Sequence, residues 1–154
     1  MDRLDLTTIQ NITDDFVKSL KLKLDSNGTT ASGDLKNSIR GLVNQNGKYI
    51  TISIQLDEYW RFIEFGTRPH FPPINAIKRW ISVKPVLPKP LPSGKLPTAN
   101  QLAYLIGRKI SKEGTKSQPF LKPTISDFNL IGKVYDEVVK LLEYKIKELT
   151  NEME

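Results

Sequence analysis

The sequence predicts a small α+β protein, in which a small antiparallel sheet packs with an N-terminal helix, a central helix and a long C-terminal helix. Three observations predict this class. Apolar residues recur every three or four positions near both ends and in the middle of the chain, as in amphipathic helices. Two runs rich in isoleucine and valine flank Gln45-Asn46-Gly47, and Asn-Gly is a strong hairpin signal. All 10 prolines lie between Pro69 and Pro123, so the two ends are free to form regular structure.

Length and composition indicate one domain spanning residues 1–154. A chain of 154 residues with 38% hydrophobic residues can build a core without disulfides or a structural metal. The absence of cysteine excludes disulfide scaffolds, thiol proteases and redox motifs. Apolar runs such as residues 49–54 are far shorter than the roughly 20 residues of a membrane-spanning helix, and the N-terminus has no signal-peptide pattern. We therefore expect a soluble protein made in a cytosol, without a membrane partner.

The N-terminal part is predicted to form two helices and the hairpin. Apolar spacing over residues 7–24 predicts an amphipathic helix. A short helix is expected to follow, with Ser32 at its N-cap. Strands are expected over residues 39–43 and 49–56, and in the second strand isoleucines alternate with polar residues, so one face should be buried.

Two short helices are predicted before residue 84. Asp57 is placed to cap a helix over residues 58–65, and Gly66 to end it in a left-handed conformation. A strand is the alternative for this segment. Pro72 and Pro73 form a good helix start, and the residues after them give a third apolar stripe: Ile74, Ile77, Trp80 and Ile81.

Residues 84–97 are predicted to form an extended arm or long loop, called the arm below. Five prolines in this segment exclude a helix and a central strand and favour a polyproline-like conformation. A stiff segment loses little entropy when it docks, so the arm is suited to reach a neighbouring molecule.

Two further helices are expected after the arm. Thr98 is placed to cap a helix over residues 99–112, which Gly114 ends, with inward residues Leu102, Leu105, Ile106 and Ile110. Residues 118–123 are expected to be extended because they hold two prolines, and the final helix to start near Ser126 or Asp127. The expected buried stripe of the final helix is Val134, Val138, Leu142, Ile146 and Leu149.

Positive charge is concentrated in the middle of the chain. Residues 61–122 hold 12 basic and two acidic residues, a net charge of +10, whereas the remaining residues carry a net charge of −4. Such a region is useful for contact with phosphates, which attract Lys and Arg independently of base sequence. A solvated basic face is the alternative.

No catalytic or metal-binding constellation is evident. His70 is the only histidine and has no cysteine or close acidic pair, so we expect a structural or surface role. Glu64 lies between Arg61 and Arg68 in the sequence, and we expect an ion pair that fixes the loop after Gly66. Carboxylate pairs on expected exposed faces are interpreted as solvated charges: Asp14-Asp15, Asp136-Glu137 and Glu152-Glu154. We therefore expect no enzymatic activity and no cofactor.

Two short motifs could contact nucleic acid but have simpler interpretations. Residues 66–68 and 114–116 each place a glycine before a hydroxyl and a cation, which could hold a phosphate; a pair of helix C-caps is the favoured interpretation. An aromatic group could stack on bases, but without an RNA-binding motif it is expected in the core: Tyr59, Trp60, Phe62 and Phe65.

Four stretches together resemble the head-tail joining, or neck, proteins of tailed bacteriophages, a family often described as tail components. They are residues 30–39 (TASGDLKNSI), 59–67 (YWRFIEFGT), 102–110 (LAYLIGRKI) and 114–123 (GTKSQPFLKP). Their order and spacing fit the family pattern from Thr30 into the final helix, about four-fifths of the chain. The resemblance implies a small α+β protein that forms a ring of identical subunits between the portal-side connector and the tail, around the DNA channel. It brings no catalytic residues.

The expected partners are therefore copies of the same chain, other connector, portal or tail proteins, and DNA in transient non-specific contact. The expected location is the neck or tail of the virion, assembled in the host bacterial cytoplasm. Contacts between subunits are expected at Pro85, Leu87, Pro88, Pro90, Leu91, Pro92, Pro119, Phe120 and Leu121. Contacts with the channel DNA or an acidic partner are expected from Arg61, Arg68, Lys78, Arg79, Arg108 and Lys109. The competing class is a free basic nucleic-acid-binding protein, and a nuclease is disfavoured because the basic region offers only Glu64 and Glu113 as metal ligands.

Overall fold

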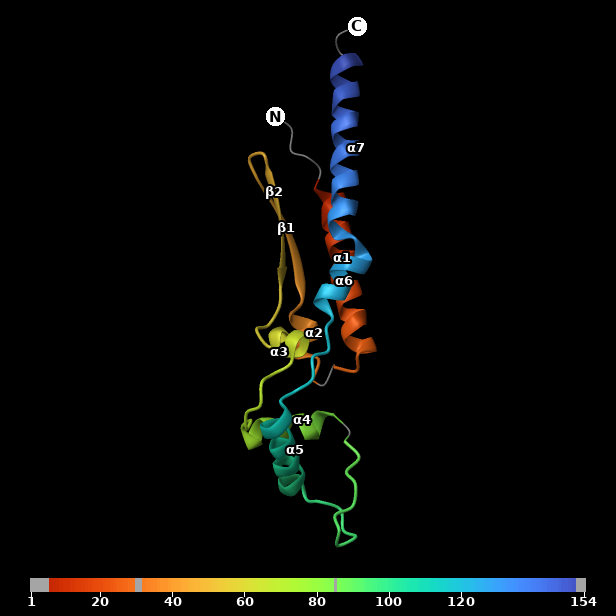
Figure 1. The fold of residues 1–154 in the computed structure, drawn as a ribbon. Helices are drawn as coiled ribbons and strands as arrows, with labels where there is room; N and C mark the ends of the chain where they lie inside the picture. The colour runs from red at the N-terminus through yellow and green to blue at the C-terminus, as the bar shows by residue number, and fades with distance from the viewer. Residues whose placement is uncertain (1–5, 30–31, 85, 152–154) are drawn as a thin grey trace.

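Helices and one β-hairpin are arranged along an elongated molecule (Figure 1). The computed structural model describes residues 6–29, 32–84 and 86–151. The elements in this part of the chain are α1 (Thr7–Ser26), α2 (Asp34–Ser38), β1 (Arg40–Asn46), β2 (Tyr49–Gln55), α3 (Trp60–Phe65), α4 (Ile74–Val83), α5 (Ala99–Glu113), α6 (Leu121–Phe128) and α7 (Leu130–Asn151). The protein is thus a small α+β fold, as predicted.

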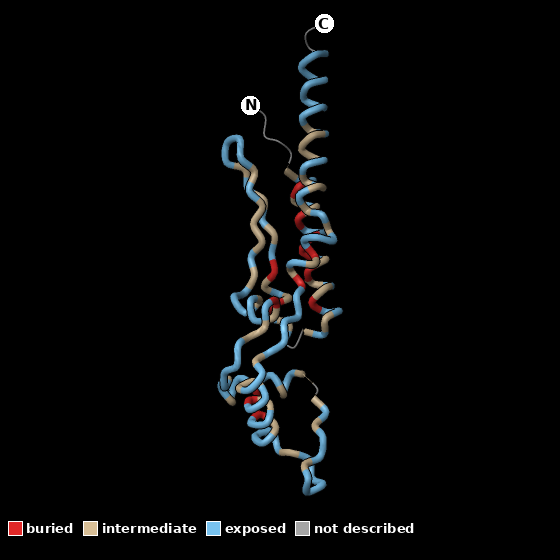
Figure 2. Tube along the Cα trace, viewed as in Figure 1, coloured by how far each residue is buried: buried red, intermediate tan, exposed pale blue. Residues whose placement is uncertain are grey.

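Helix α1 forms the middle layer at one end of the molecule. It packs against β1 on one side and against α6 and α7 on the other (Figure 1). Because both sides are covered, five of its apolar residues are buried (Ile9, Phe16, Val17, Leu20 and Leu24), whereas Leu22 is exposed. Most of the buried positions of the described chain cluster around this helix (Figure 2). The fully buried core side chains include Ile9, Phe16, Leu20, Leu24, Ile39 and Phe120.

The hairpin is present, with a turn one residue later than predicted. Asn46 pairs with Tyr49 as the last pair of the ladder, so the turn consists of Gly47 and Lys48. Gly47 has φ 59°, whereas Lys48 has no positive φ, which is the pattern of a type II′ turn. The isoleucine face of β2 is only half-buried, because the two-stranded sheet is covered by α1 on one face without a second layer.

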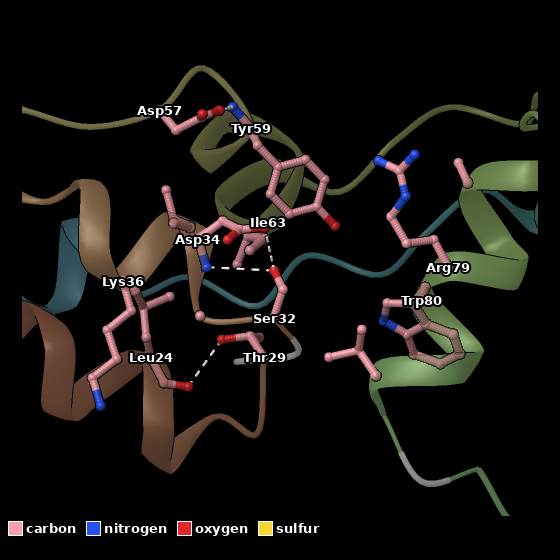
Figure 3. Close-up of a pocket in the computed structure, with 14 residues that line it drawn as sticks. Leu24, Thr29, Ser32, Asp34, Lys36, Asp57, Tyr59, Ile63, Arg79 and Trp80 are labelled. Carbon is pink, nitrogen blue, oxygen red and sulfur yellow. Dashed lines mark hydrogen bonds between the residues drawn. The ribbon is translucent and has the colours of Figure 1, made fainter.

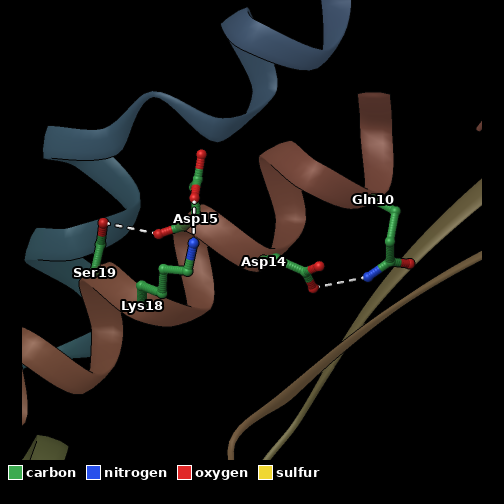
Figure 4. A network of polar contacts seen from close by, with 5 residues as sticks. All are labelled: Gln10, Asp14, Asp15, Lys18 and Ser19. Carbon is green, nitrogen blue, oxygen red and sulfur yellow. Dashed lines mark hydrogen bonds and ion pairs between the residues drawn. The ribbon is translucent and has the colours of Figure 1, made fainter. Parts of the chain in front are cut away.

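A side chain from α1 pairs with the free edge of β1. The backbone N–H of Val43 donates to Gln10 Oε1 at 3.2 Å, and Gln10 Nε2 donates to the carbonyl of Gly41 at 3.3 Å. Gln10 Nε2 also donates to Asp14 Oδ1 at 2.9 Å (Figure 4). The amide of Gln10 therefore satisfies edge groups that a third strand would otherwise occupy.

The caps of the two short helices differ from expectation. The predicted cap at Asp57 is wrong, because α3 starts at Trp60 and its N-cap is Tyr59, which makes no side-chain cap hydrogen bond. Asp57 Oδ1 instead accepts the backbone N–H of Tyr59 at 3.0 Å in the turn before the helix. Gly33, with φ 84°, holds the N-cap position of α2 in place of Ser32. The Ser32 hydroxyl instead donates to the Asp34 carboxylate at 2.6 Å.

The C-terminal helical region begins earlier than predicted. Helix α6 starts at Leu121, so residues 121–123 form a first helical turn and are not extended. Pro123 is tolerated there because the first N–H groups of a helix have no partner within it. Asn129, at φ 52° and ψ 49°, separates α6 from α7, so two helices stand where the sequence predicts a single final helix.

Most of the stripe predicted as buried on α7 is open to solvent. No described residue of α7 is buried, because the helix extends past the end of α1 (Figures 1 and 2). The large apolar residues exposed on α7 are Ile131, Tyr135, Leu142, Tyr144, Ile146 and Leu149.

Helices α4 and α5 pack together at the end opposite to the hairpin (Figure 1). The central helix α5 thus has α4 as its main partner rather than the sheet. Thr98 caps α5 in a capping box with Gln101, as its position predicted. The buried face of α5 is formed by Ala103 and Gly107, whereas Leu105, expected inward, is 42% exposed.

Candidate assembly interface

Two segments, residues 66–68 and 114–116, run between the ends of the molecule and hold each other; we call this place the crossing. Thr67 N–H donates to the Thr115 carbonyl at 3.1 Å, and Thr115 N–H donates back to the Thr67 carbonyl at 3.3 Å. The two Gly-Thr motifs end helices, as favoured, and the structure adds that they pair with each other.

The glycines of the crossing make the close approach possible. Gly66 and Gly114 have φ 71° and φ 70°, with ψ −171° and −162°, so the chain leaves each helix extended. The left-handed conformation predicted for Gly66 is therefore wrong, although its φ is positive. A Cβ on Gly66 would overlap the Thr115 carbonyl oxygen, and a Cβ on Gly114 would overlap that of Thr67. Only glycine fits both the backbone conformation and the space.

Glu64 fastens the start of α6, which corrects the expected ion pair. Its carboxylate accepts the backbone N–H groups of Phe120 at 2.8 Å, Leu121 at 2.9 Å and Lys122 at 2.9 Å. The side chain is buried, and no ion pair of Glu64 occurs among the described residues. A negative charge at a helix N-terminus satisfies unpaired N–H groups and suits the helix dipole. Glu64 therefore has a structural role.

A groove runs between α3 and α4, close to the crossing. It consists of two cavities of about 340 Å³ and 640 Å³. Both cavities are lined by Thr29, Tyr59, Ile63, Ala76 and Trp80, which makes them continuous, and we call them together the aromatic groove. Figure 3 shows Tyr59 and Ile63 on one side of the smaller cavity and Arg79 and Trp80 of α4 on the other.

Three of the four aromatic residues predicted in the core are exposed. Tyr59, Phe62 and Phe65 are 53%, 54% and 71% exposed, whereas Trp60 is half-buried and packs against the core. The rings of Tyr59 and Phe62 lie 6.0 Å apart in an edge-on arrangement. Exposed aromatic side chains next to an apolar groove are typical of surfaces that bind a partner.

The six predicted basic contacts lie on several elements. Arg61 is on α3, Arg68 is in the crossing, and the remaining four are on the helix pair α4 and α5. Five are exposed and Lys78 is half-buried. Among the described residues none of the six forms an ion pair, so their charges are available to a partner.

The residues of the arm that are predicted to contact other subunits lie at the surface. Leu87 is 95% exposed, Pro90 and Pro92 are exposed, and Pro88 and Leu91 are half-buried. Pro85 lies outside the described residues.

In the second predicted contact segment, the prediction is wrong for Phe120. This residue is fully buried within its own chain and packs in the core around α1, so it has no surface to offer another subunit. Leu121 is half-buried and packs against the same core, and Pro119 is exposed. Of the three residues, Pro119 thus has the most surface open to a partner.

His70 lies on the surface, as expected, and belongs to no acidic cluster. Its Nδ1 lies 2.8 Å from the Arg68 carbonyl oxygen. The described residues hold no group of three or more His, Asp or Glu side chains that could bind a metal ion. Within residues 6–29, 32–84 and 86–151, no helix is long and apolar enough to cross a membrane.

Sequence reasoning did not find the aromatic groove. Its residues come from the end of α1 and the turn after it, from α2, from α3 with the residues before it, from α4 and, in the larger cavity, from the crossing and α5. The sequence places Trp80 and Ile77 on one apolar stripe, but Ile77 is buried and Trp80 is 37% exposed. The only signal available was the number of aromatic residues between residues 59 and 80.

Comparisons with known proteins give no match: no family model, no curated protein and no solved structure corresponds to this chain.

Proposed function

We propose that this protein is a structural component of the head-tail joint of a tailed bacteriophage, where copies of the chain form a ring around the DNA channel. The proposal starts from the order and spacing of the four sequence stretches described above. The observation that carries it in three dimensions is the amount of apolar surface left uncovered by the described chain itself. Soluble monomers rarely leave large continuous apolar patches uncovered.

Two regions of this uncovered surface lie on separate elements. Exposed aromatic residues lie on α3 and its N-cap in the middle of the molecule, and a second exposed apolar set lies along α7 at the hairpin end (Figure 1). A head-to-tail ring needs two different surfaces on each subunit, because the interface closes by rotation. An elongated subunit with two separate apolar regions supports this arrangement.

The positively charged region, residues 61–122, is suited to a position beside DNA. The cations on α4 and α5 that lack an ion pair in the described chain lie on the part of the molecule that carries the arm. Sequence-independent attraction to phosphates is useful in a channel, provided that it is weak enough for DNA to pass.

The test is electron microscopy of lysates from a phage whose copy of this gene carries an early stop codon. Separate DNA-filled or leaking heads together with unattached tails are the expected result. Intact, joined particles would contradict the proposal and favour a free nucleic-acid-binding protein. A phage with a silent change at the same codon is the matched control.

A further inference from the structure

The arm is a largely apolar segment whose own chain leaves Leu87, Pro90 and Pro92 exposed and covers Val86, Pro88 and Leu91 only in part. It loops out beyond α5, at the end of the molecule opposite to the hairpin (Figure 1). Within the described chain no backbone hydrogen bond involves residues 86–90. The tip is held by its own turn, in which Leu91 N–H donates to the Lys95 carbonyl at 2.9 Å. Leu87 makes almost no contact, as its 95% exposure shows.

The aromatic groove has the chemistry that receives such a segment. Proline-rich chains bind in grooves lined by aromatic side chains, because a preformed extended conformation loses little entropy. An extended proline-rich chain has no internal hydrogen bonds, so its carbonyls accept donors from the partner. The Tyr59 hydroxyl and the Trp80 indole N–H supply donors at the groove, and both side chains are partly exposed (Figure 3).

The charge of the arm is complementary to that of the groove at the end next to α2. Two carboxylates, Asp34 and Asp57, line this end, and the charge of Lys36 is already paired with Asp25 at 2.6 Å. Arg79 is the other cation of this end. Lys89 is the only charged residue between residues 86 and 94, so the arm brings one positive charge to two carboxylates.

The chain's own arm does not fill the groove. Among the described arm residues only Lys84 lines it, and Lys84 Nζ donates to the Gly28 carbonyl at 2.8 Å. Beyond this residue the arm turns away and returns to Thr98, the N-cap of α5 (Figure 1). Both ends of the arm are therefore anchored on the α4–α5 pair, which leaves the groove open to another chain.

We propose that the arm of one copy docks into the aromatic groove of a second copy. The inference deepens the proposed function and rests on it for the assembly of identical subunits. Arm and groove are different surfaces, so the contact is head-to-tail and can repeat from subunit to subunit until a ring closes.

The test uses the absence of cysteine from the chain. One copy carries Leu87→Cys in the arm, and a second copy, with a tag of different size, carries Ala76→Cys in the groove. The two purified proteins are mixed at high concentration and oxidised, and the disulfide-linked heterodimer is measured on a non-reducing gel. The matched control for the groove is Asn75→Cys, an exposed neighbour on α4 that lines neither cavity.

We expect the Leu87–Ala76 pair to give about tenfold more heterodimer than the Leu87–Asn75 pair, because a disulfide needs Cα atoms within about 7 Å. Equal yields for the two pairs would overturn the inference. A chain that carries both Leu87→Cys and Ala76→Cys should link to other chains. If it links only within itself, the arm fills its own groove and the inference is wrong.

A second pair of variants tests the aromatic wall of the groove. Tyr59→Ala removes a side chain that lines both cavities, and Phe65→Ala removes a nearby exposed aromatic that lines neither. Each is combined with Ala76→Cys and cross-linked to the Leu87→Cys copy, after circular dichroism has shown the same helix content. Tyr59→Ala should lower the heterodimer yield to that of the Leu87–Asn75 pair, whereas Phe65→Ala should retain the full yield. The same yield from both variants would overturn docking in the groove.

Failure of this inference is distinguishable from failure of the proposed function. If the early-stop phage gives joined particles, the proposed function at the head-tail joint is wrong, even if the cross-link between arm and groove forms. If heads and tails are separate but Ala76→Cys cross-links no better than Asn75→Cys, the proposed function stands and the docking of the arm in the groove is wrong.

Discussion

At the scale of single residues, Glu64 joins two distant parts of the chain. It lies on α3 and accepts hydrogen bonds from three backbone N–H groups at the start of α6, 56 to 58 positions later in the sequence. Buried N–H groups that lose their acceptor are left unsatisfied, which is costly in an apolar environment.

Glu64→Gln should therefore lower the free energy of unfolding by about 2–3 kcal/mol, because an uncharged amide offers fewer acceptor sites than a carboxylate and turns a donor toward the N–H groups. Urea denaturation measures the change. Glu113→Gln is the control. Glu113 is the other acidic residue of residues 61–122, its side chain is exposed, and the substitution should leave the urea midpoint of unfolding unchanged. Equal midpoints for both variants would mean that the carboxylate does not fasten α6.

Gly66 is the second residue whose role depends on a distant segment. Its φ of 71° and ψ of −171° belong to a region that is open to glycine, and the Thr115 carbonyl fills the place of a Cβ. Gly66→Ala should lower the free energy of unfolding by more than about 2 kcal/mol. Gly28→Ala is the control, since Gly28 has φ 64° but open space around it, and about 1 kcal/mol is expected. Similar losses in thermal denaturation would contradict the close crossing.

At the scale of elements, α5 shows how small residues can form a packing face. Ala103 and Gly107 lie one turn apart and face α4 and the segment before it. A Cβ on Gly107 would lie 3.0 Å from Phe71 Cζ and 3.2 Å from Ile77 Cδ1. The close approach of the two helices therefore depends on the absence of larger side chains on this face.

Ala103→Leu should destabilise the protein by about 1–3 kcal/mol, because extra methylenes in a packed face force neighbouring groups apart. Leu105→Ala, on the face that the sequence predicted as buried, should cost about 1 kcal/mol or less. The two variants are compared by urea denaturation. The reverse order of stabilities would mean that the leucine face of α5 is the packed one.

At the scale of the whole molecule, the described part of the chain has two ends with different chemistry. The hairpin, α1 and α7 form one end with much of the core, and the α4–α5 pair with the arm forms the other (Figures 1 and 2). Of the six predicted basic contacts, four lie on the second end, which is therefore the end expected to approach DNA.

DNA affinity should be weak and should fall as salt rises, with a slope that reports the number of phosphate contacts. Replacing Arg108 and Lys109 together by alanine should lower that slope by about two units if both contact phosphates. Replacing Lys140 and Lys147 on α7 removes the same charge and should change the slope less. Fluorescence anisotropy with duplex DNA at several salt concentrations measures this, and binding that is insensitive to salt would contradict the channel role.

The sequence by itself determined much of the local structure, because periodicity and capping act between neighbours in the chain. The local predictions that were wrong include the caps of α2 and α3 and the extended conformation of residues 121–123. The 3.6-residue pattern of α1, the cap at Thr98, the hairpin turn near Gly47 and the irregular arm are all present in the described chain. The first strand ends at Asn46 and not at residue 43, and α1 ends at Ser26 and not at residue 24. Each of these local features depends on interactions that span a few residues.

Only the tertiary structure decided what each element packs against. The face of α5, the burial of Phe120, the exposure of α7 and the role of Glu64 depend on which distant segment lies opposite. The aromatic groove likewise exists only because the turn after α1, the start of α3 and the face of α4 come together. Such contacts are chosen by the packing of the whole chain, whereas the pattern along a helix records only that one of its sides is apolar.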